Sequence, residues 1–114
     1  MRGISVADVL EYVSKLQDLV DLHEFMEDDD LGEAMNLAVK CIAKPDMPPS
    51  VARTALLKMQ GYAFQFRMQA AAYTYIHKGK AGTQENVKKN VYFAASEQCH
   101  DLAQTLKYLV KEAF

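Results

Sequence analysis

The chain has 114 residues, half of them apolar, and a formal net charge of −2. These values predict a single domain, residues 1–114, built around one small core. No apolar run approaches the roughly 20 residues that cross a bilayer. Asp8 and Glu11 interrupt the apolar start "MRGISVADVLEYV", so we expect no signal peptide, no membrane partner and a cytoplasmic location.

The charge is divided unevenly along the chain. Residues 1–50 hold 4 Lys/Arg against 11 Asp/Glu, whereas residues 51–114 hold 9 against 4, which gives −7 and +5. A division of this kind favours either a basic surface for an anionic partner or attraction between the two halves, within one fold or across an oligomer.

The first half predicts two short helices between about residues 5 and 43. Ser5 begins the first helix, which runs to about Met26 and repeats its apolar residues with heptad spacing. Asp30 and Glu33 resemble a capping box for the second helix, from Leu31 to about Ala43. The seam of the first helix is a candidate oligomer interface and contains Val6, Val9, Val13, Leu16 and Val20.

The second half predicts a long helical hairpin over about residues 50–112. Pro45, Pro48 and Pro49 form a break at 45–49 that separates the acidic from the basic half. A helical pattern then continues to about His77, "GKAG" at 79–82 ends it, and a second pattern follows from Thr83. Two long helices joined by a short loop fold back antiparallel. The predicted fold is all-α, with the two N-terminal helices packed on this hairpin.

No segment carries a recognised catalytic motif. "GKAGT" lacks the first glycine of a phosphate loop, and the side chains of "CHD" at 99–101 point about 100° apart on a helix. His23 and Glu27 in "HEFMEDDD" are the best metal candidates, yet a second histidine is missing and a solvated acidic helix end is the favoured interpretation. Cys41 and Cys99 have no CxxC spacing, which indicates reduced, packed thiols. We expect no enzyme, no cofactor and no bound metal.

A basic and aromatic cluster flanks the predicted hairpin turn. Lysines bind phosphates and aromatic rings stack on unpaired bases, a combination typical of proteins that bind single-stranded nucleic acid. Lysines at an exposed helix end are also ordinary solubilising residues, and tyrosines at these spacings also fit a core. The candidate nucleic-acid-binding residues are Tyr75, Lys78, Lys80, Lys88, Lys89 and Tyr92.

Residues 51–114 contain four distinctive segments: "LLKMQGYAFQFRMQAAAYTYI", the glycine turn, "KKNVYFAASE" and "LAQTLKYLVK". By these segments the chain resembles small helical accessory proteins of bacteriophages. The segments are similar to T4-type recombination mediators, which form ring-like oligomers and load recombinase onto single-stranded DNA. The resemblance implies DNA contacts for Lys78, Lys80, Lys88 and Lys89, and a host-cell cytoplasmic location if the chain is phage-encoded. The acidic first half departs from that pattern.

Two functions therefore follow from the sequence. The first is a homo-oligomeric accessory factor of DNA recombination or replication that binds single strands weakly through the hairpin tip. The second is a protein-binding adaptor or inhibitor that acts through the acidic "EFMEDDD" end or through a surface rich in methionine, a residue common at adaptable interfaces. For a homo-oligomer, the surface left for another subunit is either the Val and Leu seam or the Met and Phe side of the third helix.

Overall fold

The computed structural model describes residues 6–43, 48–76 and 84–113, and these residues are almost entirely helical. The predicted all-α class is confirmed, because no strand occurs within these ranges. None of the helices in this part of the chain combines the length and hydropathy of a membrane-spanning segment. The elements are α1 (Val6–Leu22), the 3-10 turn η1 (Glu24–Met26), α2 (Asp29–Ala43), α3 (Pro49–Ile76) and α4 (Gln84–Ala113).

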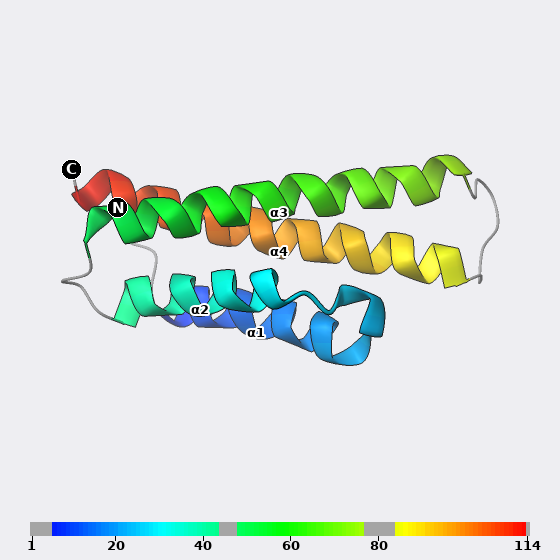
Figure 1. The fold of residues 1–114 in the computed structure, drawn as a ribbon, viewed down its shortest axis with the longest axis horizontal. Coiled ribbons are helices and arrows are strands. Elements are labelled where there is room, and N and C mark those ends of the chain that lie inside the picture. Colours follow the sequence, from blue (N-terminus) through cyan, green and yellow to red (C-terminus); the bar gives the residue numbers. More distant parts are fainter. Residues whose placement is uncertain (1–5, 44–47, 77–83, 114) are drawn as a thin grey trace.

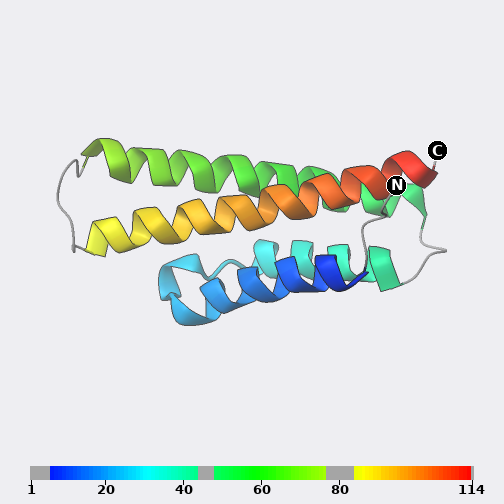
Figure 2. The same ribbon diagram turned by 180° about the vertical axis from the view of Figure 1, so that it is seen from behind.

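The four helices form two layers of unequal length. The long helices α3 and α4 lie side by side and run in opposite directions, and α1 and α2 form a second antiparallel pair beneath them (Figures 1 and 2). Helix α1 packs against α4, and α2 packs against α3. Because α1 and α2 have 17 and 15 residues while α3 and α4 have 28 and 30, one end of the long pair projects beyond the second layer.

The core lies between the two layers and receives side chains from every helix. Small residues such as Ala34, Ala38, Ala55 and Ala95 let the helices approach closely, and larger ones fill the space between them. The largest fully buried side chains are Val9, Leu16, Leu31, Met59, Cys99, Leu102 and Leu106.

The heptad seam of α1 is used within one chain. Val9 and Leu16 are only 1% and 0% exposed, and Val13 and Val20 are half-buried against the same core. Val6 begins α1, but its side chain lies outside the described part. The burial corrects the predicted interface role of Val9 and Leu16, because neither offers surface to another subunit. The periodicity identified an apolar face correctly, but α2 and α4 of the same chain cover it.

The start of α2 differs from the predicted capping box by two residues. The Asp28 carboxylate is the N-cap: its Oδ1 accepts hydrogen bonds from the backbone N–H groups of Asp30 at 2.9 Å and Leu31 at 3.2 Å. These two N–H groups have no partner within the helix, so the cap stabilises the first turn of α2. The first helix also ends earlier than predicted, at Leu22 rather than near Met26, because His23 adopts an extended backbone conformation.

Asp28 also connects α2 to α3. The Tyr62 hydroxyl on α3 donates a hydrogen bond to the Asp28 carboxylate. Burial of the ring, followed by the negative charge of Asp28, raises the pKa of Tyr62 to about 12. A single carboxylate therefore fixes both the start of one helix and its position against another.

We predict that Asp28→Ala lowers the free energy of unfolding by about 1–2 kcal/mol, since the N-cap is lost. Asp28→Asn keeps a good cap and should stay within about 0.5 kcal/mol of the wild type. Urea unfolding followed by circular dichroism measures both changes. The charge-matched control is Asp29→Ala, which removes a neighbouring exposed carboxylate and loses only the smaller helix-dipole contribution. An equal loss for Asp28→Ala and Asp29→Ala would contradict the capping role.

Candidate nucleic-acid interface

The structure describes three of the six predicted nucleic-acid-binding side chains. Lys78 and Lys80 lie outside the described residues, and Tyr75 belongs to α3 but its side chain is not described. The other three residues lie near the beginning of α4, where Lys88 and Tyr92 contact Phe25 of the second layer. Lys88, Lys89 and Tyr92 are all half-buried.

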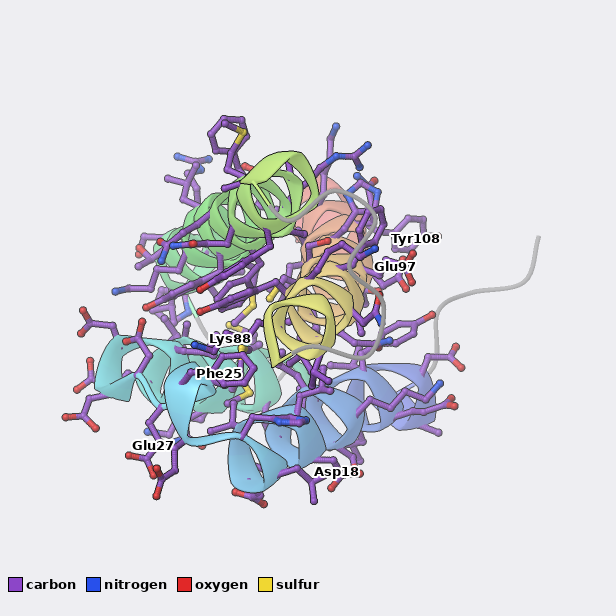
Figure 3. The ribbon with its side chains drawn as sticks, turned by 90° about the vertical axis from the view of Figure 1, so that its right-hand side faces the viewer. Asp18, Phe25, Glu27, Lys88, Glu97 and Tyr108 are labelled. Carbon is purple, nitrogen blue, oxygen red and sulfur yellow. The ribbon has the colours of Figure 1, made fainter. Side chains whose placement is uncertain are left out.

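Lys88 lies over two aromatic rings. Its Nζ is 5.5 Å from the centroid of the Phe25 ring, in η1, and 6.0 Å from the centroid of the Tyr73 ring, in α3. Figure 3, which looks along the helices from the projecting end, shows Lys88 reaching from α4 towards Phe25 in the second layer. Both distances fall within the range of a cation–π interaction. The ammonium therefore stabilises the junction of the layers.

Tyr92 is part of an aromatic cluster that joins three elements. Its ring stacks on Tyr73 at 5.9 Å and on Phe66 at 5.9 Å, and it meets Phe25 at 5.3 Å with an interplanar angle of 59°. Burial, followed by the neighbouring Tyr73, raises the pKa of the Tyr92 hydroxyl. The sequence left two interpretations open for Tyr92, stacking on a base and packing in the core. In this structure its ring packs against other rings of the protein.

Phe25 is the residue that sequence reasoning missed. It lies within the acidic segment "HEFMEDDD", where the carboxylates drew attention to metal binding instead. In the structure its ring lies 5.3 Å from both the His23 ring and the Tyr92 ring, so it anchors the turn between α1 and α2 to the long helices. A signal was available in the sequence, because Phe25 is a large apolar residue among the five acids of this segment, and phenylalanine is among the residue types most often buried.

The outer side of α3 is a second surface that carries large exposed apolar residues. Leu57, Phe64 and Met68 are 61%, 68% and 55% exposed, respectively. Next to them a groove of about 470 Å³ runs between α3 and α4. Arg67, Glu97, His100 and Asp101 are among its lining residues, so this groove contains charges of both signs.

The remaining candidates for catalysis or metal binding do not form a site in the described residues. Cys99 is fully buried, and burial raises its thiol pKa to about 12, so it is protonated at neutral pH. His100 beside it is exposed. No group of three or more His, Cys, Asp or Glu side chains suited to a metal ion occurs in the described ranges.

Charge is separated between the two layers. Residues 6–43 hold two Lys/Arg against ten Asp/Glu, whereas α3 and α4 hold seven against four. Figure 3 shows Asp18 and Glu27 directed away from the long helices, on the far side of the second layer. The acidic half of the sequence has therefore become one face of the molecule.

Comparison of the chain with protein-family models, with curated proteins and with solved structures finds no match.

We predict that the contact between Phe25 and Lys88 stabilises the fold by a measurable coupling energy. A double-mutant cycle of Phe25→Leu and Lys88→Met should give about 0.5–1 kcal/mol, because the leucine keeps an apolar side chain but removes the ring face that attracts the cation. Urea unfolding of the four proteins measures it.

The matched control replaces Lys88→Met by Lys89→Met. The next residue of a helix points about 100° away, so its coupling to Phe25 should fall within about 0.3 kcal/mol of zero. Equal coupling for both lysines would mean that general electrostatics, and not the ring contact, produces the effect.

Proposed function

We propose that this protein is a non-enzymatic accessory factor of phage-type DNA recombination or replication, and that it binds single-stranded nucleic acid through the projecting end of α3 and α4. The observation that carries the proposal is the separation of charge between the layers. The acidic layer repels a polyanion, while the long helices carry the excess of cations, so a strand is directed to one side of the molecule.

The described residues supply phosphate contacts at this end. Lys88 and Lys89 lie in the second turn of α4, and the Lys88 ammonium meets Phe25 beside the acidic turn. The rings under Lys88 restrict its side chain, which reduces the entropy lost when it meets a phosphate. Contacts of this kind do not read sequence, and their strength falls steeply with salt.

An exposed aromatic ring lies beside these lysines. Phe93 is 46% exposed and follows Lys89 by one helical turn, so the two side chains share a face of α4. Base stacking on an aromatic side chain contributes about 1–3 kcal/mol and tolerates any base. Phe93 thus replaces Tyr92 as the proposed stacking residue, because the Tyr92 ring contacts three rings of its own chain.

We predict weak, salt-dependent binding of a labelled single-stranded oligonucleotide, measured by fluorescence anisotropy. Each phosphate contact should contribute about −0.7 to the slope of log K against log salt, so Lys78, Lys80, Lys88 and Lys89 together give a slope of at most about −3. Changing all four to Ala should abolish binding, and Lys88→Ala with Lys89→Ala should halve the slope. Phe93→Ala should weaken binding about 5–150-fold at constant slope.

The control variant changes four lysines far from this end, Lys15, Lys40, Lys58 and Lys107, to Ala. It has the same net charge as the test variant, so it separates local contacts from overall charge. Unchanged affinity of the test variant at low salt, or equal losses in test and control, would reject the proposed site.

A second candidate function, a protein-binding adaptor or inhibitor, is supported by the exposed apolar side chains on α3 and by the exposed acidic turn before α2. A photo-crosslinking amino acid at Met68 or Glu27 should then label one specific protein in extract of the producing cell. The same group at Ser14, exposed on α1, should not. Identical labelling from all three positions would reject this function.

A further inference from the structure

The outer face of α3 has the residue spacing of a helix–helix contact. Leu57, Gly61, Phe64, Met68 and Ala71 are all exposed, and they follow one another at intervals of four, three, four and three residues. This alternation averages 3.5 residues and keeps side chains on one stripe of a helix that packs along another helix. We call these five residues the α3 seam.

The fold of one chain does not use the α3 seam. Helix α3 packs on α4 and α2 through its opposite side, where Ala55, Met59, Phe66 and Ala70 are buried. The three large seam side chains are each more than half exposed. A monomer thus leaves an apolar stripe along the middle of α3, and exposed apolar patches of this kind often mark interaction sites.

Gly61 is a second, independent observation. It lies in the middle of a 28-residue helix, where glycine is less stable than alanine by about 0.5–1 kcal/mol. A Cβ atom added there would meet nothing within 4 Å, so no contact inside the chain requires glycine. A missing side chain on an exposed seam lets the surface of another molecule approach closely.

We propose that the α3 seam binds the α3 seam of a second copy of this chain, antiparallel and about a two-fold axis. Centred between residues 62 and 63, this register places Leu57 against Met68 of the second copy and Phe64 against its Gly61. Each Phe64 ring then fills the space over a glycine, and Ala71 lies opposite Thr54 at the edge of the contact. A self-complementary surface of this kind is what an isologous dimer requires.

The residues beside the α3 seam fit the same arrangement. On the side nearer α4, Gln60 comes next to Arg67 of the second copy. On the other side, Lys58 comes next to Gln65 of the second copy. Both pairs join an amide oxygen to a cation, and like charges do not face each other. All four residues are exposed in the single chain and are free to rearrange on contact.

The size of the contact sets its strength. The seam from Leu57 to Ala71 is about 21 Å long and a helix is about 10–12 Å wide, so the contact covers less than the roughly 800 Å² per partner of a stable complex. We therefore expect a dissociation constant in the micromolar range. The two projecting ends would lie about 40 Å apart on opposite sides of the dimer, so the dimer is independent of the nucleic-acid proposal.

Sedimentation equilibrium from about 5 to 500 μM tests the dimer, since this range brackets micromolar dissociation. The wild type should change from monomer to dimer, and Phe64→Glu should remain monomeric. Gly61→Leu should weaken association at least tenfold while staying fully helical. The matched control Leu10→Glu changes an equally apolar, 46% exposed residue on α1 and should associate like the wild type.

Disulfide trapping tests the register, in a background with Cys41→Ser. A mixture of Leu57→Cys and Met68→Cys copies should form a mixed disulfide, whereas Leu57→Cys alone should not, because its two copies lie about 16 Å apart. A monomer at 500 μM overturns the proposal, and so does a dimer that Phe64→Glu leaves intact. If the wild type is a monomer and Phe64→Glu weakens oligonucleotide binding, the α3 seam binds nucleic acid instead. That result also overturns the dimer proposal.

Discussion

The difference in helix length is the constraint on which the rest of this structure depends. Helices α1 and α2 have 17 and 15 residues, and they pack on a pair with 28 and 30. Two short helices can complete a core along part of a long pair, on one side only. The projecting end and the outer side of α3 therefore stay exposed, and the two proposed binding surfaces lie there.

The aromatic cluster marks the point where the core ends. Phe25 comes from the turn between the short helices, and it meets Tyr92 and Lys88 from the long ones. Large rings cover the end of an apolar core with few residues. The Lys88 cation is stable over them because the ring faces attract it. Asp28, three residues later, starts α2 and holds Tyr62. The turn thus fixes the short layer to the long one.

Local patterns predicted the helices well because their causes are local. Pro48 and Pro49 end one helical pattern before the next, and the three-or-four spacing of apolar residues identifies α2, α3 and α4. The identity of the helix that covers an apolar face does not depend on local sequence. The seam containing Val9 and Leu16 has the same spacing whether it faces the same chain or another, and only the three-dimensional arrangement shows that α2 and α4 cover it.

The same limit explains what sequence reasoning missed at the candidate site. The sequence left two apolar surfaces for another subunit, the seam of the first helix and the Met and Phe side of the third, and nothing local showed that the side with Phe64 would be the uncovered one. Tyr92 and Phe93 are adjacent aromatic residues in the sequence, and a rotation of about 100° puts the first into the cluster and the second into solvent.

The central claim is that the separation of charge between the layers decides where a nucleic-acid strand lies. Backbone amide chemical shifts, measured by NMR during titration with a single-stranded oligonucleotide at low salt, test it most directly. Our account predicts shift changes in the first turns of α4, around Lys88, Lys89 and Phe93, and none in α2. Changes centred on Asp29–Ala43, or no change anywhere, would contradict it.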